Sequence, residues 1–314
     1  MTSHTDSTYT DSTYTDSTYT DSTYTDSTYT GSIIAWYDVH ARDLPWRAGD
    51  ATPWGVLVSE IMLQQTPVAR VLPVWRAWLD RWPTPAALAA EPSGEAVRAW
   101  GRLGYPRRAL RLHEAARAIV ERHGGEVPAA HADLLALPGI GAYTAAAVAS
   151  FAFGQRHAVL DTNVRRVLSR LVSGAEYPPK SQTKAEVALA ESLLPPDAPT
   201  AARWAVAVME LGALVCTARS PRCVDCPVLD RCRWHRDGRP AHDGPPRRGQ
   251  TYAGTDRQCR GRLLAVLRDA DGPVEKPALD VVWSDAVQRE RALDALVADG
   301  LVDPLDDGRY ALPA

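Results

Sequence analysis

The segment CTARSPRCVDCPVLDRC, residues 216–232, contains four of the chain's five cysteines. The four are Cys216, Cys223, Cys226 and Cys232, with gaps of six, two and five residues between them. A loop this short can wrap four thiolates around one metal centre. A zinc ribbon usually joins two Cys-x-x-Cys pairs from distant points, and only one such pair occurs here. Soft thiolate ligands from one tight loop therefore favour one [4Fe–4S] cluster, with zinc as the alternative.

The composition is that of a globular chain with two or three domains. It has 314 residues and is 45% hydrophobic. No apolar run approaches the roughly 20 residues that a membrane-spanning helix needs, so we expect no membrane partner. The N-terminus lacks a basic region followed by a hydrophobic one, so we expect no secretion signal. Clustered thiols that must stay reduced fit a cytoplasmic protein.

The net charge is close to neutral once an acidic N-terminal segment is set aside. Residues 1–30 contain five Asp and no Lys or Arg, so the rest of the chain has 35 basic and 33 acidic residues. A nucleic-acid surface would therefore depend on local clusters of arginine. Two candidate clusters are Arg107, Arg108 and Arg111, and Arg165, Arg166 and Arg170.

The chain divides into a repetitive tail, a long helical region and a short C-terminal segment. The pentad Asp-Ser-Thr-Tyr-Thr repeats five times from Asp6 to Thr30, which predicts a disordered, dispensable tail over residues 1–30. Residues 31–235 are mostly α-helical in pattern, and residues 236–255, rich in Pro, Gly and Arg, form a linker. Residues 256–314 predict helices and a final small hairpin, as in a winged helix-turn-helix module. The helices expected along the chain cover 109–123, 142–153, 164–172, 201–215, 261–268, 276–281 and 286–299.

Three further segments are candidates for chemistry. The turn Leu137-Pro-Gly-Ile-Gly141 joins two helices and could expose backbone N–H groups to a phosphate, although such turns are often simple connections. Asp161 precedes the next predicted helix. It could be the N-cap of that helix, a carboxylate at the mouth of a cleft, or both. Glu60 and Gln64 lie one turn apart on a helix whose apolar stripe is on another face. Glu60 is either a solvated surface residue or a semi-buried acid with a raised pKa.

These elements together resemble the helix-hairpin-helix DNA glycosylases that carry an iron–sulfur loop. The nearest resemblance is to adenine DNA glycosylases of the MutY type, which remove adenine mispaired with 8-oxoguanine. It covers about residues 33–234 and implies a mostly α, two-lobed fold. The segments that carry it are LPWR (44–47), SEIMLQQT (59–66), LGY (103–105), LPGIGAYT (137–144), LDTNVRR (160–166), MELGA (209–213) and the cysteine loop.

One position separates two branches of this superfamily. Relatives such as endonuclease III carry a Lys after the hairpin, which attacks the sugar and lets the enzyme cut the strand. Tyr143 stands at that position here and cannot form an imine. The chain therefore resembles the monofunctional adenine branch. The alternatives are a bifunctional glycosylase/lyase for oxidised pyrimidines and a non-catalytic iron–sulfur regulator that binds DNA.

The resemblance implies a role for each matching residue. The adenine is flipped into a pocket; Glu60 protonates its N7, and ionised Asp161 stabilises the oxocarbenium-like sugar. Tyr143 and Asn163 orient these groups, and Arg47 and Glu210 help to line the pocket. The expected partner is double-stranded DNA with adenine opposite 8-oxoguanine or guanine, bound by a monomer that associates with the nucleoid through its DNA. The remaining DNA contacts are expected from Gln64, Gln65, Thr66, Leu103, Tyr105, Gly139 and Gly141, with core packing as the alternative for Leu103 and Tyr105.

The C-terminal segment departs from many members of the family. Those members carry a Nudix-like domain that checks for 8-oxoguanine, and this segment is too short for such a fold. It is similar to the short module of some actinobacterial members. The sequence therefore leaves open how strongly 8-oxoguanine is selected, and whether the module adds duplex affinity or only caps the fold. Cys259, the fifth cysteine, is expected to be an unliganded thiol.

Overall fold

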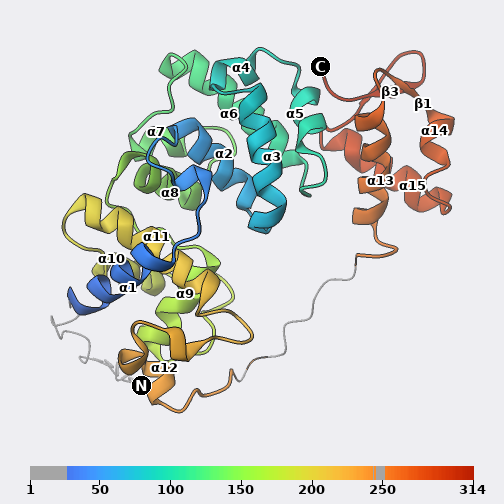
Figure 1. Cartoon of the computed structure of the whole chain (residues 1–314). Helices are drawn as coiled ribbons and strands as arrows, with labels where there is room; N and C mark the ends of the chain where they lie inside the picture. Colours follow the sequence, from blue (N-terminus) through green and yellow to red (C-terminus); the bar gives the residue numbers. More distant parts are fainter. Residues whose placement is uncertain (1–26, 243, 245–251) are drawn as a thin grey trace, which may run out of the picture.

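The computed structural model describes residues 27–242, 244 and 252–314 (Figure 1). The first helix, α1 (Ser27–His40), begins four residues inside the segment for which the repeats predict disorder. That prediction is wrong for residues 27–30, which are helical; Tyr29 packs against the core beneath it and its ring faces Arg231. The rest of the repeats, and residues 243 and 245–251 of the predicted linker, lie outside the described residues. None of the helices in the described ranges combines the length and the apolar composition of a membrane span.

The fold is mostly α-helical, as predicted, and the described helices of residues 27–236 form two lobes (Figure 1). The predicted helices are confirmed to within a few residues at their ends, except that the one predicted over 164–172 finishes as a π-helical turn, Ser169–Ser173. The first lobe contains α2 (Pro53–Leu63), α3 (Val68–Arg81), α4 (Pro85–Ala89), α5 (Ser93–Trp100), α6 (Arg107–His123), α7 (His131–Leu135) and α8 (Ala142–Phe153). The second contains α1, α9 (Thr162–Leu168), α10 (Lys184–Ser192), α11 (Ala198–Leu214) and α12 (Arg233–Arg236).

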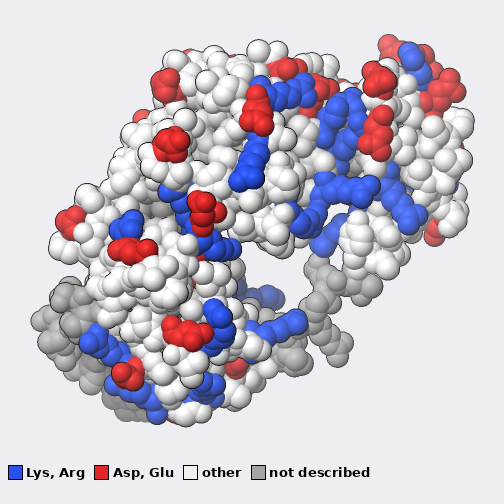
Figure 2. All heavy atoms as spheres, in the orientation of Figure 1, with Lys and Arg blue, Asp and Glu red and all other residues white. Residues whose placement is uncertain are grey.

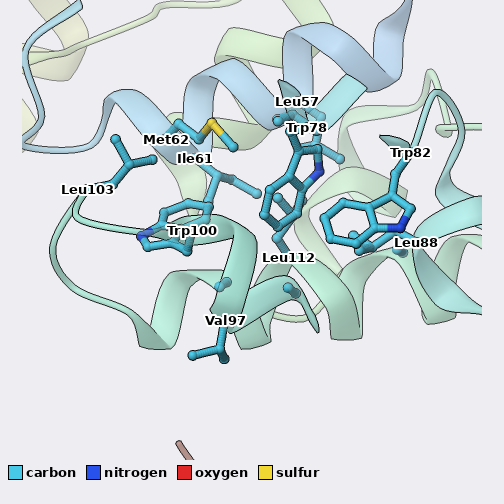
Figure 3. Packing of buried hydrophobic residues seen from close by; sticks show 14 of the residues in the cluster. Leu57, Ile61, Met62, Trp78, Trp82, Leu88, Val97, Trp100, Leu103 and Leu112 are labelled. Carbon is cyan, nitrogen blue, oxygen red and sulfur yellow. The ribbon is translucent and has the colours of Figure 1, made fainter. Parts of the chain in front are cut away.

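Each lobe has its own apolar core. In the first lobe, the rings of Trp78 and Trp82 meet edge to face at 4.7 Å, and those of Trp78 and Trp100 at 5.8 Å. Figure 3 shows these three rings close to the buried side chains of α2. Helix α2 is buried on all sides from Trp54 to Met62, so the predicted single apolar stripe is wrong. A helix buried all round is held firmly by its neighbours, and this matters for the polar residues it carries.

The C-terminal segment packs against the first lobe and shares its core. Its elements are α13 (Asp256–Asp269), β1 (Val274–Glu275), α14 (Lys276–Asp280), α15 (Ala286–Ala298), β2 (Asp303–Pro304) and β3 (Arg309–Ala311). The three strands form one antiparallel sheet in the order β1-β3-β2, and the predicted final hairpin is confirmed as β2–β3. Assignment of the segment as a winged helix remains a prediction. Buried residues of α13, including Cys259, belong to the same apolar cluster as α2 and α6.

Two arginines fasten this segment to α5. Arg98 of α5 donates to carbonyls at the end of α13, including Ala270 O at 2.8 Å. Arg268 of α13 donates in return to Val97 O, at the end of α5, at 2.8 Å. Cations are favoured at helix C-termini, where carbonyls lack intrahelical partners. Gly94 completes the junction, since its N–H bonds Pro313 O at 2.7 Å and a Cβ there would lie 2.4 Å from that oxygen.

Candidate active site

A cavity of about 1080 Å³ brings most of the predicted site residues together. Its walls come from both lobes, chiefly from α2, the 137–141 turn, α8, the start of α9 and α11. Leu103, Tyr105 and Glu210 do not line it, although Glu210 contacts two residues that do. The predicted residues in its wall are Arg47, Glu60, Gln64, Gln65, Thr66, Gly139, Gly141, Tyr143, Asp161 and Asn163.

Glu60 is a buried acid on a rigid helix. Its exposed fraction is 5%, so the solvated-surface alternative is excluded. The phenol of Tyr143, in the first turn of α8, donates a hydrogen bond of 2.8 Å to Glu60 Oε2. Burial raises the pKa of Glu60 to about 7, against the opposing effects of the Tyr143 hydrogen bond and the Arg47 charge. Glu60 can therefore both give and accept a proton near neutral pH.

Asp161 has the two roles that the sequence left open. Its Oδ1 accepts from Val164 N at 2.6 Å and caps α9, while its Oδ2 accepts from Asn163 Nδ2 at 2.7 Å. Burial raises the pKa of Asp161, but these hydrogen bonds favour its charged form. Among the described residues, the hydrogen bond to Glu60 comes from the neutral phenol of Tyr143. The two carboxyl groups thus differ: Glu60 keeps its proton up to about pH 7, whereas the Asp161 carboxylate accepts hydrogen bonds that oppose the effect of burial on its pKa.

Tyr143 remains a neutral donor to Glu60. Burial raises its pKa well above the usual 10, and the nearby charges of Glu60 and Asp161 raise it further. The phenol therefore stays protonated at any pH at which the protein would work. A lysine amine at this position would lie against the same acid, so the presence of Tyr143 removes the imine-forming nucleophile without removing the donor.

Glu210 is fully buried and anchors two arginines beneath the cavity. Arg42 binds it through Nε and Nη2 at 2.7 Å each, and Arg47 Nη1 lies 2.8 Å from Glu210 Oε2. Burial alone would raise the pKa of Glu210, but the Arg42 hydrogen bonds and the Arg47 charge lower it to about 2. Arg42 was missed from the sequence. Its only signal was its place just before the Leu44–Arg47 motif.

The 64–66 segment leaves α2 in a sharp, strained turn. Helix α2 ends at Leu63, Gln64 is its C-cap, and Gln65 has a φ of 54°, which is unusual for a residue with a side chain. Gln64 Nε2 lies 3.4 Å from Thr144 Oγ1, across the cavity mouth. The Arg108 guanidinium donates to Met62 O and Gln64 O at 3.1 and 2.7 Å and so ends the helix. Strain held by such contacts is common at functional sites.

Of the residues predicted to contact DNA, Thr66 and Leu103 are buried, whereas Tyr105 is exposed, as such a contact requires. Thr66 and Leu103 are 6% and 3% exposed, so core packing is the correct alternative for Leu103. Tyr105 is instead 46% exposed, with a φ of 48°. Arg108 is also buried, so only Arg107 and Arg111 of the first arginine cluster reach the surface.

The turn 137–141 has the geometry expected of a phosphate-binding hairpin. Gly139 has a φ of 73°, and a Cβ there would meet the Arg111 side chain at 2.7 Å. Gly141 is the N-cap of α8, and no side chain caps the helix. The first N–H groups of α8 therefore keep their capacity to bind an anion, helped by the helix dipole.

The cysteine loop is tied to the second lobe by a buried arginine. Arg170 is 1% exposed and donates to Thr217 O at 2.8 Å and to Cys216 Sγ at 3.4 Å. Arg166 is also buried and donates to Cys216 O at 2.7 Å. The prediction that Arg166 and Arg170 form a DNA surface is therefore wrong. Their guanidinium groups are hydrogen-bonded within the protein, Arg166 to Cys216 O and Gly212 O and Arg170 to Thr217 O and Ala218 O.

The four thiols suit an iron–sulfur cluster. Burial and the three neighbouring thiols together raise the pKa of Cys226 to about 12, so four bare thiolates would repel one another here and a cationic centre would stabilise them. Within the described ranges no three His, Cys, Asp or Glu are gathered tightly enough for one metal ion, and the choice of a cluster rests on the all-thiolate donor set. Cys216, Cys223, Cys226 and Cys232 would be its ligands.

Comparisons with known proteins agree with this geometry. Residues 58–192 match the model of the HhH-GPD superfamily of base excision DNA repair proteins, and residues 216–232 match the iron-sulfur binding domain of endonuclease III. The chain is 55% identical over 286 residues to an adenine DNA glycosylase of Mycobacterium tuberculosis, covering 90% of this chain and 92% of the relative. It is 57% identical to that of Mycolicibacterium smegmatis over 281 residues, 89% of this chain and 94% of the relative. Among solved structures, a thermostable thymine-DNA glycosylase aligns with a TM-score of 0.61 and 29% identity, covering 67% of this chain and 95% of that one.

Proposed function

Because the chain belongs to the adenine DNA glycosylase family within the HhH-GPD superfamily of base excision DNA repair proteins, we propose that it hydrolyses the N-glycosidic bond of adenine opposite 8-oxoguanine or guanine. The chain is a DNA glycosylase that carries a [4Fe–4S] cluster and acts on DNA. One observation carries the proposed mechanism. Glu60, with a pKa of about 7, and Asp161, held by two hydrogen bonds, line the same cavity, with Tyr143 hydrogen-bonded to Glu60.

Bond cleavage requires the leaving base to accept a proton. The Glu60 carboxyl group gives its proton to adenine N7, and the electron pair of the C1′–N9 bond leaves with the neutral base. The sugar becomes oxocarbenium-like, and the Asp161 carboxylate stabilises its positive charge, or binds it transiently. The fixed positions of both side chains mean that neither has to reorganise during the reaction.

Hydrolysis is completed by water. The Glu60 carboxylate, now ionised, takes a proton from the water that attacks C1′. This returns Glu60 to its starting state, which suits a group whose pKa lies near the working pH. Tyr143 orients Glu60 in both steps, and Asn163 orients Asp161.

The remaining parts of the site hold the DNA. The free N–H groups of α8 would bind a phosphate of the strand that contains the adenine. The [4Fe–4S] cluster would fix the 216–232 loop and present Arg219, Arg222 and Arg231 to the backbone. Exposed Tyr105 and strained Gln65 are the residues proposed to enter the duplex and contact the opposing 8-oxoguanine. We also propose that the protein is monomeric and cytoplasmic.

Single-turnover kinetics on a duplex with one adenine:8-oxoguanine pair test this function. Wild-type protein should release adenine and leave the strand intact until alkali is added. Borohydride should trap no covalent adduct, since Tyr143 cannot form an imine. Release of no adenine would refute the substrate, and a trapped adduct would instead support the glycosylase/lyase alternative.

A further inference from the structure

A second cavity, of about 1430 Å³, lies between the first lobe and α13. Its wall contains ten arginines and only two acidic residues, Asp269 and Asp299. Figure 2 shows blue side chains gathered along the boundary between the first lobe and the C-terminal segment. The arginines are Arg70, Arg98, Arg102, Arg107, Arg108, Arg111, Arg257, Arg260, Arg262 and Arg268. We call this the arginine cavity.

The structural hydrogen bonds of its buried arginines do not neutralise their charge. Arg108 donates to Ile61 O and Gly104 O, and Arg268 donates to Val97 O, at distances of 2.8 to 3.0 Å. Carbonyl oxygens satisfy these donors but carry no net charge. Burial lowers the pKa of both guanidinium groups to about 10, so both remain cations near neutral pH. Cations held in a partly desolvated wall attract anions more strongly than exposed ones do.

Acidic residues are too few at this wall to balance the charge. Asp299 is shared, since Arg107 and Arg260 both bind its carboxylate. The other surfaces of the C-terminal segment differ. There Arg291 on α15 pairs with Asp256, and Arg309 on the β2–β3 hairpin pairs with Asp307. Residues 252–314 carry eight basic and twelve acidic residues, so the positive charge of this segment is local to the α13 side that faces the first lobe.

The arginine cavity adjoins the active-site cavity. Gln64 and Gln65 line both, so a ligand passing the strained turn reaches either one. Tyr105 stands at the same junction, with the guanidinium groups of Arg108 and Arg257 each 5.5 Å from its ring centre. One comes from the first lobe and the other from α13. An exposed aromatic ring between cations is a surface suited to a nucleotide and its phosphate.

We propose that the arginine cavity binds backbone phosphates of the same DNA whose adenine enters the active site. In this arrangement α13, rather than α15 or the β2–β3 hairpin, is the DNA-facing element of the C-terminal segment. The proposal rests on the proposed function only in taking DNA as the ligand. It assigns the segment a binding role, which core packing alone does not require.

The test is a binding measurement on duplex DNA without a mispair, by fluorescence anisotropy at several salt concentrations. Arg257 and Arg262 are the exposed arginines of α13 in this wall. The double variant R257Q/R262Q should bind on the order of tenfold or more weakly at about 0.1 M salt, and its slope of log affinity against log salt should fall by about 2. R257K/R262K keeps the charges and should keep most of the affinity. Arg111→Gln, on the facing wall, should lower the slope by about 1.

The matched control is R291Q/R309Q, which removes the same charge from the α15 and hairpin surfaces. It should bind like the wild type. The proposal would be overturned if R257Q/R262Q kept the wild-type salt slope, or if R291Q/R309Q lost as much DNA affinity as R257Q/R262Q. If the wild-type protein binds DNA but releases no adenine, the proposed function is refuted. The arginine-cavity proposal would still stand or fall by the salt slopes of the variants.

Discussion

Glu60→Gln should lower activity and, at alkaline pH, raise stability. Folding raises the pKa of Glu60 from its usual 4.5 to about 7, because burial disfavours the carboxylate. Below pH 4.5 the carboxyl group is protonated in both the folded and the unfolded state, so its burial does not lower the free energy of unfolding there. As the pH rises to 7, the folded state loses stability relative to the unfolded state, and above 7 the loss is constant. At about 1.4 kcal/mol per pKa unit, that loss is about 3 kcal/mol.

Gln cannot ionise and keeps the shape of Glu, so the variant avoids this loss. Its stability relative to the wild type should grow from near zero at pH 4.5 to about 3 kcal/mol above pH 7. Its rate of adenine release should fall about 100-fold or more, since it has no proton to give. Wild-type activity should itself decline as the pH rises above 7 and Glu60 loses its proton.

Urea unfolding between pH 4.5 and 9 measures the stability of both proteins, with cluster content followed by visible absorbance. Glu121→Gln, at an exposed glutamate of α6, is the control for a simple change of charge. If the stability difference between Glu60→Gln and the wild type does not grow with pH, the raised pKa of Glu60 is refuted. A variant with full single-turnover activity would refute its role in protonating the base.

Three further predictions concern the groups around Glu60. Tyr143→Phe removes the hydrogen bond that lowers the pKa of Glu60, so the decline of the excision rate should move to higher pH in a pH–rate profile. Asp161→Asn keeps a good N-cap for α9, so the thermal midpoint should change little, whereas the single-turnover rate should fall about 100-fold or more. A much less stable variant would show that capping is the main role of Asp161. Glu210→Gln leaves two arginines beneath the cavity without their buried carboxylate, and denaturant unfolding should show a loss of about 3 kcal/mol.

The sequence allowed the candidate catalytic residues to be named because motifs are local. The cysteine spacing indicated the cluster loop, the Leu137–Gly141 turn indicated the hairpin, and Tyr143 separated two branches of one superfamily. Helix limits followed from caps and periodicity in the same way. Asp161 could be given both of its roles because an N-cap is recognisable from its immediate neighbours.

The arginines show where sequence reasoning failed. Arg166 and Arg170 were expected to contribute to a DNA surface, because a nucleic-acid surface on this chain would depend on local clusters of arginine. Each is instead buried and donates to carbonyls distant in sequence, as Arg170 does to the 216–232 loop. The pairing of Arg42 with Glu210 could not be predicted, since the two residues lie 168 positions apart in the sequence.

By itself, the sequence determined which residue types are available for chemistry and the local turns and helices that carry them. The tertiary structure decided their charge states and their surroundings. Only packing buries Glu60 and so brings its pKa to about 7, and only the docking of α13 on α5 creates a cavity in which ten arginines meet. The physical reason is that desolvation and electrostatic potential depend on every group packed nearby, and most of those groups are distant along the chain.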